Sequence, residues 1–262
     1  MIKFFRKIRF GMISKNKISN YIIYAIGEIV LVVIGILIAL QINNWNEERK
    51  DRIQEQKILA LLREEFISNL NQIESKIKLR NNIMKESSEV LDYMDSQKDI
   101  ELDSLIQKIS AMVLAPTFDP IQNQMLNSER LQLIQNDTLR RYLSNWPSSI
   151  LDLREQENEW VFIYNNITVP FLIDFGIARN VHLSFYNNAT NLNYMQDKNL
   201  SRKILLKKSN NSPSVKEILN NKKLEGLLAS AVLINEGINW ESQARLNQMI
   251  KIIELIESEI HK

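Results

Sequence analysis

The chain has 262 residues, enough for one domain of ordinary size and an additional segment. Its 33 basic and 31 acidic residues leave a net charge of +2, which argues against a nucleic-acid-binding surface. With no cysteine, disulfides, thiolate metal sites and cysteine nucleophiles are excluded, and two histidines offer little for metal ligation or acid–base chemistry. Only 6 glycines and 5 prolines favour helices over a β-rich or phosphate-loop fold. We therefore expect an all-α protein without a cofactor, a metal site or a nucleic-acid partner.

The first twenty residues combine cations with apolar side chains and contain no acidic residue. Apolar residues recur at helical spacing on one arc, and basic residues occupy most of the other. The basic residues that we expect to face anionic lipid are Lys3, Arg6, Lys7 and Arg9. We predict that residues 1–20 form a basic amphipathic segment on the inner leaflet, where each cation contributes about 1 kcal/mol. The alternative is a segment that only sets the topology.

Residues 21–43 are predicted to form a transmembrane helix. From Ile22 to Ile42 the chain is apolar apart from Glu28, Gln41 and small residues. A helix of this length spans about 30 Å, the thickness of the hydrocarbon core of a bilayer. Aromatic residues that favour the headgroup layer flank it, namely Tyr21, Tyr24 and Trp45. These flanks disfavour a buried helix of a soluble domain, and the long apolar run without a small-x-small cleavage pattern disfavours a signal peptide.

The distribution of charge predicts the orientation of this helix. Basic residues precede it without any acid, whereas acidic residues offset the basic ones immediately after it. The positive-inside rule therefore places the N-terminus in the cytoplasm and residues 44–262 on the opposite side of the membrane. We expect the helix to remain as an uncleaved anchor.

Glu28 is an acid inside the predicted membrane helix, where a charge costs about 3 kcal/mol at the centre. On a helical wheel Glu28 shares a face with Val32, and the same face contains the small-xxx-small pair Gly35 and Ala39. We predict that this face packs against a second transmembrane helix, from another copy of the chain or from another membrane protein. In the alternative interpretation Glu28 is protonated or reaches the headgroups, and the small residues are incidental.

Residues 44–262 are predicted to form an up-and-down helical bundle. From Asn46 the chain contains no glycine or proline until position 116, and apolar residues recur in steps of three, four and seven. This pattern predicts a helix of about fifty residues that continues from the membrane helix and carries a coiled-coil-like seam. Arg80 and Ser87 interrupt the seam.

Further elements follow from apolar periodicity and cap signals. The series from Leu224 to Ile260 predicts a long C-terminal helix, antiparallel to the first and preceded by a short helix that starts at Ser214. The remaining expectations are helices over 100–114, from Pro120 with Asp119 as cap, over 131–146, and from Pro147 to a kink or end at Pro170. Residues 176–211 are expected to be a loop with short elements, either as a solvated connector or as a binding surface.

The block MIKFFRKIR…YAIGEIVLVVIGILIALQINNWNEERK resembles a family of bacterial single-span membrane proteins known only as a domain of unknown function. A second patch, TFDPIQNQMLNSERLQLIQNDTLRRY, is similar to a recurring pattern of that family, which often has Ser-Gly-Asn-Leu where this chain has Ser128-Glu129-Arg130-Leu131. The resemblance implies a Gram-negative inner-membrane protein with a helical periplasmic domain. It implies no activity and no catalytic residues.

Three classes of function are compatible with these patterns. A membrane-anchored interaction module is favoured, because a long helix with an apolar seam suits helix-on-helix association with a membrane partner or a second copy. The alternative is a ligand sensor that signals through a separate protein, since only about twenty residues are predicted to face the cytoplasm. An enzyme is disfavoured, because the acidic pairs lie in charge-rich helices and no nucleophile–base motif has a convincing context.

Overall fold

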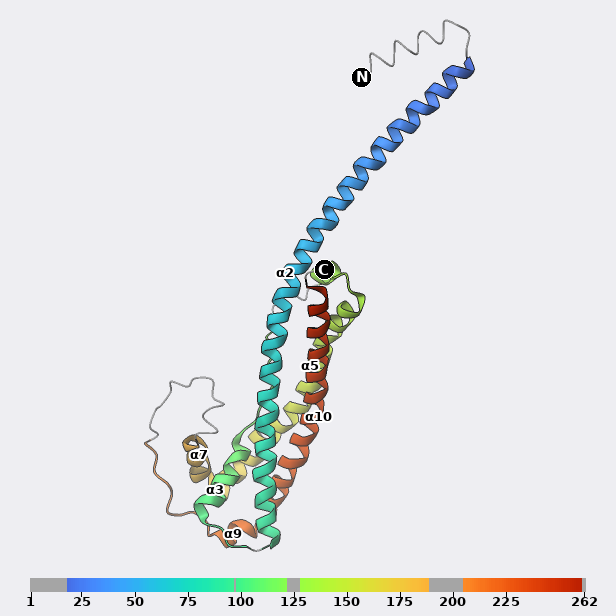
Figure 1. The fold of residues 1–262 in the computed structure, drawn as a ribbon. Coiled ribbons are helices and arrows are strands. Elements are labelled where there is room, and N and C mark those ends of the chain that lie inside the picture. The colour runs from blue at the N-terminus through green and yellow to red at the C-terminus, as the bar shows by residue number, and fades with distance from the viewer. Residues whose placement is uncertain (1–17, 97, 122–127, 189–204, 261–262) are drawn as a thin grey trace. The chain divides into compact units, whose positions relative to one another are not determined.

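The computed structural model describes residues 18–96, 98–121, 128–188 and 205–260 (Figure 1). Every regular element in these ranges is a helix, which confirms the predicted all-α class. The chain divides into two compact units, Met1–Lys57 and Ile58–Lys262.

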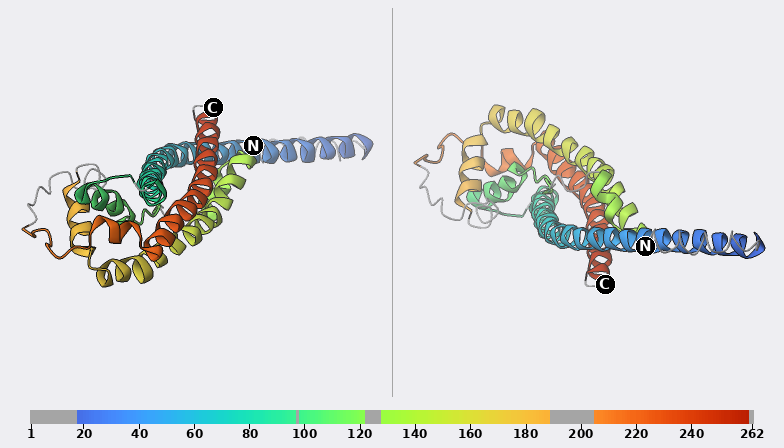
Figure 2. Two further views of the ribbon diagram at one scale, coloured as in Figure 1. Left: turned by 90° about the horizontal axis from the view of Figure 1, so that it is seen from below. Right: turned by 90° about the horizontal axis from the view of Figure 1, so that it is seen from above.

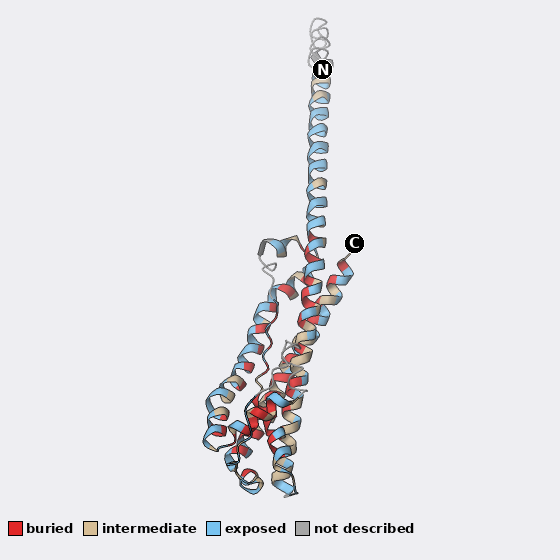
Figure 3. Ribbon diagram, turned by 90° about the vertical axis from the view of Figure 1, so that its left-hand side faces the viewer, coloured by how far each residue is buried: buried red, intermediate tan, exposed pale blue. Residues whose placement is uncertain are grey.

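The first unit contains the N-terminal part of helix α2 (Ile18–Ser96). This single helix joins the predicted membrane segment to the predicted long helix after it, so the expected continuity is confirmed. Its most apolar stretch has a mean hydropathy of 2.8, and none of that stretch is buried. In Figure 3 this part of α2 has mainly the colour of exposed residues. The helix is therefore a candidate membrane span by length and composition.

In the second unit, residues 58–96 of α2 pack with α5 (Asp137–Ile163) and α10 (Lys222–Glu259). Arg63 binds Glu257 near one end of the pair, and Arg80 binds Ser242 further along. The order reverses along α10, which confirms the predicted antiparallel packing of α2 and α10. Helices α5 and α10 also lie side by side (Figures 1 and 2).

The core between these helices is large and aromatic at its centre. Phe66 of α2 and Trp146 of α5 are fully buried, with ring centroids 5.2 Å apart. At roughly 1.5–3 kcal/mol for each large apolar side chain removed from water, such residues supply the main driving force for folding the bundle.

Residues of α2 at the predicted heptad spacing are buried, and the two polar residues that interrupt the apolar series are buried as well. Leu59, Phe66 and Ile73 are buried at intervals of seven. The next two positions in this series, Arg80 and Ser87, are also fully buried. The seam therefore continues through polar residues, and the bundle accommodates them inside its core.

Shorter helices complete the described part of the second unit. They are α3 (Leu102–Ser110), η1 (Ala111–Val113), α4 (Ser128–Leu133), the π-helical turn η2 (Tyr164–Thr168), α6 (Val169–Asp174), α7 (Ala178–Asn187) and α9 (Val215–Leu219). The predicted start of α9 is confirmed, since Ser214 and Glu217 form a reciprocal capping box.

Two sequence predictions about helix boundaries are wrong. Helix α5 begins at Asp137, capped by Asn136, and runs through Pro147 without ending there. Pro120 and Ile121 are not helical, because their segment pairs with side chains of α2; the rest of that predicted helix, residues 122–127, lies outside the described residues. The short helix α7 lies in the stretch that was expected to be a loop with short elements.

The turn between α6 and α7 explains how that helix arises. Gly176 has a φ of +81°, a left-handed conformation that favours glycine. The amide of Ile177 donates to the carbonyl of Leu172, and the amide of Gly176 donates to that of Ile173, which together form a Schellman motif. The buried side chain of Ile177 fixes this turn, so α7 starts in a new direction immediately after α6.

Candidate functional site

The residues predicted to form the membrane-helix packing face all lie in α2. Glu28 is partly exposed, and Val32 and Ala39 are exposed. An added Cβ at Gly35 would meet no atom within 4 Å, so the surface there is open. The regular helix keeps the four residues at the predicted spacing, but their packing against a second helix stays a prediction.

The predicted interfacial residues have different outcomes. Tyr21 and Tyr24 lie in α2, with Tyr24 partly exposed, and Trp45 is exposed. The predicted inner-leaflet residues Lys3, Arg6, Lys7 and Arg9 lie outside the described residues. Their contact with lipid therefore stays a prediction.

A polar cluster lies in the core of the second unit and was not anticipated from the sequence. The guanidinium of Arg80 forms an ion pair with the carboxylate of Glu157 on α5, and both side chains are buried. The same guanidinium donates to Ser242 Oγ at 2.8 Å and to Asn239 Oδ1 at 3.4 Å, both on α10. One side chain of α2 thus contacts the two other long helices of the bundle.

Burial opposes ionisation throughout this cluster. It raises the pKa of Glu157 despite the nearby charge of Arg80 and the backbone amide of Phe118, both of which favour the carboxylate. Burial also lowers the pKa of Lys76, one turn before Arg80, although Glu157 acts in the opposite direction. Since a buried ion pair gains little over apolar packing, we interpret the cluster as a device that fixes the register of the helices.

An extended segment, residues 114–121, obtains its backbone hydrogen bonds from side chains of the helices. Asn69 pairs with both backbone groups of Ile121, at 2.8 and 3.1 Å, and Gln72 pairs with both of Asp119, each at 2.9 Å. We call these two pairings the amide clamps. Because they satisfy donors and acceptors that have no secondary-structure partner, they hold the segment along α2.

The same segment contacts the polar cluster and α5. Glu157 accepts two hydrogen bonds from the amide of Phe118, at 2.9 and 3.0 Å, and Arg80 donates to the carbonyl of Pro116 at 3.4 Å. The indole of Trp160 donates to the carbonyl of Leu114 at 2.9 Å. Side chains at successive turns of α2 and α5 therefore determine the path of the extended segment.

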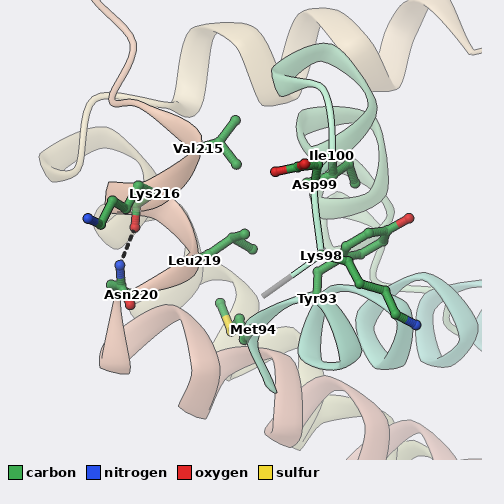
Figure 4. Close-up of a pocket in the computed structure, with 9 residues that line it drawn as sticks. All are labelled: Tyr93, Met94, Lys98, Asp99, Ile100, Val215, Lys216, Leu219 and Asn220. Atoms are coloured by element: carbon green, nitrogen blue, oxygen red, sulfur yellow. Dashed lines mark hydrogen bonds between the residues drawn. The ribbon is translucent and has the colours of Figure 1, made fainter. Parts of the chain in front are cut away.

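A cavity of about 590 Å³ lies between the C-terminal end of α2, residues 98–100 and α9 (Figure 4). Its apolar lining consists of Met94, Ile100, Val215 and Leu219, and its polar lining consists of Tyr93, Lys98, Asp99, Lys216 and Asn220. This volume is within the range of small-molecule sites. A smaller cavity of about 340 Å³, between α3 and α7, has a mostly polar lining that includes Asn180 and Lys208. In the described ranges, no three His, Cys, Asp or Glu side chains gather as a metal site would require.

Comparison with known proteins identifies one family. A model described as "Family of unknown function (DUF6090)" matches residues 28–125. This confirms the resemblance to a family of unknown function. The matched DUF6090 region includes most of α2 and the extended segment, so both sides of each amide clamp lie inside it, whereas Glu157 lies outside. No curated protein and no solved structure matches the chain.

Proposed function

We propose that the protein is a non-catalytic, membrane-anchored interaction module. In this proposal α2 crosses the bacterial inner membrane once, the N-terminus is cytoplasmic and the second unit is periplasmic. The face of Glu28, Val32, Gly35 and Ala39 associates with another copy or with a different membrane protein.

One observation supports this proposal above the others: the first unit exposes its apolar side chains, whereas the second unit buries them. From Ile29 to Trp45 every residue of α2 is exposed, and most are large and apolar. The second unit instead buries its apolar residues in its own core. A helix that exposes apolar side chains over this stretch, uncovered by the described residues of its own chain, suits lipid and other membrane helices as surroundings.

The test is affinity purification of the tagged full-length protein from mild detergent, read by native mass and by co-purifying chains. We expect a homo-oligomer or a stoichiometric membrane partner that is lost in Glu28→Leu and Gly35→Leu. Gly27→Leu is the matched control, because Gly27 is equally open but lies about 100° away from the proposed face. Unchanged association in both face variants would contradict the proposal.

A second candidate, ligand sensing through a separate partner, has the cavity beside α9 in its favour. That cavity lies at the C-terminal end of α2, and α2 also contains the candidate membrane span. A ligand there contacts the helix that in this candidate function carries the response toward the membrane. Discrimination requires a binding measurement on the cavity itself.

A further inference from the structure

The cavity beside α9 leaves parts of apolar side chains exposed, although these side chains also pack against the core. Met94, Val215 and Leu219 are half-buried and point into the cavity (Figure 4). Ile100 completes this lining from the opposite side. A hydrocarbon group that enters the cavity removes these surfaces from water, at roughly 25 cal/mol for each Å² covered.

The charged residues that line the cavity differ in orientation. The carboxylate of Asp99 points into the space, whereas the ammonium groups of Lys98 and Lys216 point away from it (Figure 4). The C-terminal end of α2 adds the negative end of its dipole, and its last turn contains no basic residue. At the N-terminal end of α9 the carboxylate of Glu217 accepts hydrogen bonds from Ser214, so this end of the helix already has an anionic partner. The interior therefore favours a cation over an anion.

We propose that this cavity binds a small apolar primary ammonium compound. The ammonium group donates a charge-assisted hydrogen bond to the Asp99 carboxylate, and the hydrocarbon part lies against Met94, Val215 and Leu219. The proposal names a ligand class for the ligand-sensing candidate. Its biological role rests on that candidate function, whereas the binding itself is measured directly. It is independent of the packing face around Glu28.

The probe is 3-methylbutylammonium, titrated by ligand-observed NMR into the full-length protein in lipid nanodiscs, with empty nanodiscs as the blank. Two compounds with the same 3-methylbutyl group, 3-methylbutan-1-ol and 4-methylpentanoate, test the head group. We expect saturable binding of the ammonium at millimolar concentration. The alcohol and the carboxylate should bind at least about tenfold more weakly, since a hydrogen bond to a charged group is the difference between them.

Variants assign the binding to the cavity. Asp99→Asn should weaken the ammonium at least about tenfold, and Leu219→Trp, which fills the space, should abolish saturation. Asp92→Asn is the matched control, because Asp92 is exposed on α2 and does not line the cavity. Lys216→Gln, which removes a cation from the lining, should not weaken ammonium binding. Urea unfolding followed by the buried Trp146 and Trp160 shows that each variant retains the fold.

Several results would overturn the proposal. One is the absence of saturable ammonium binding, and another is equal ammonium binding by the wild type and Asp99→Asn. A third is stronger binding of 4-methylpentanoate that is lost in Lys216→Gln, since this result would make the cavity an anion site. The association test with Glu28→Leu stands apart from each of these results, so failure of one proposal is distinguishable from failure of the other.

Discussion

At the scale of single residues, the bundle depends on a buried charge whose partners are distant in sequence. Arg80 joins Glu157, Asn239 and Ser242 in a volume from which water is excluded. Removing one partner leaves the other buried and uncompensated, which costs more than the pair contributes over apolar packing. The cluster therefore makes one arrangement of α2, α5 and α10 much better than any shifted register.

The first prediction concerns this pair. Arg80→Met should lower the free energy of unfolding of the second unit by about 3–5 kcal/mol, because Glu157 stays buried without its counter-charge. The double variant Arg80→Met, Glu157→Leu should lose less than the sum of the two single variants. Urea unfolding of the full-length protein in detergent, followed by tryptophan fluorescence, measures both. Arg154→Met is the control, since the pair that Arg154 forms with Asp119 at 3.5 Å is exposed. If the losses in the double variant were additive, the coupling between Arg80 and Glu157 would be contradicted.

The second prediction concerns pH. Lys108 of α3 pairs with Glu86, at 3.0 Å, and with Glu89 of α2. The hydrogen bond from Lys108 lowers the pKa of Glu89 below its ordinary 4.5. Burial acts to lower the pKa of Lys108, but its bonds to Glu89 and Glu86 outweigh burial and raise it above 10.5.

These directions fix the sign of the pH effect. The contribution of Glu89 is complete above its unfolded pKa and is lost as the pH falls through the lower folded value, whereas that of Lys108 is lost only as the pH rises through its raised value. Lys108→Met should therefore cost a constant amount, below about 1 kcal/mol, between pH 6 and 9. In unfolding experiments at pH 3.5 the difference from the wild type should shrink; an undiminished difference there would show that the contact is not electrostatic.

At the scale of elements, the extended segment 114–121 is held by side chains that a helix displays at its ordinary spacing. Asn69 and Gln72 are three residues apart in α2, so their amides project from one face and reach alternate residues of the extended chain. This arrangement gives the segment hydrogen bonds without a β-strand partner. It also fixes the chain that leads from η1 toward α4.

The third prediction tests the amide clamps. Asn69→Ala should cost about 1–3 kcal/mol, because Asn69 is buried and its loss leaves the amide and carbonyl of Ile121 unpaired. Hydrogen exchange should become faster at the amide of Ile121, and in Gln72→Ala at the amide of Asp119. Asn71→Ala, on the exposed side of the same turn, should change neither amide. Faster exchange over the whole bundle in Asn69→Ala would indicate global destabilisation in place of local release.

The fourth prediction concerns Pro147, which lies exposed in the interior of α5. Proline cannot donate to the carbonyl of Leu143 and its ring crowds that group, which costs up to about 3 kcal/mol in a helix interior. Pro147→Ala should therefore raise the unfolding midpoint. Ser148→Ala, at the next exposed position, controls for helix propensity alone; an unchanged midpoint in Pro147→Ala would show that α5 has already relaxed around the ring.

The sequence allowed prediction of those features that depend on local pattern. The continuous apolar run gave the candidate span, heptad steps gave α2 and α10, and the Ser214 and Glu217 pair gave the start of α9. The polar cluster and the clamps could not be found in this way, because Arg80 and Glu157 are 77 positions apart and nothing local indicates their pairing. The bounds of α7 were not predicted within the expected loop with short elements, because the stretch is rich in asparagine; the helix buries Val181, Leu183 and Phe185.

At the scale of the whole molecule, the two units differ in the polarity of their exposed surfaces. The exposed apolar surface of α2 in the first unit suits hydrocarbon, and the second unit has a separate core with charged exposed residues. The DUF6090 match extends from Glu28 to position 125, so it includes the larger part of the candidate span together with the clamped segment.

The fifth prediction tests the proposed topology of the whole chain. The protein has no cysteine, so a single introduced thiol reports its own position without any background. Ser68→Cys lies at an exposed position of α2 in the second unit, and Ser14→Cys lies before the candidate span. If the N-terminus is cytoplasmic, as the positive-inside rule predicts, a membrane-impermeant maleimide added to spheroplasts should label Ser68→Cys and leave Ser14→Cys unlabelled until the membrane is permeabilised. The reverse pattern would invert the orientation, and labelling of both positions before permeabilisation would contradict a membrane-spanning α2.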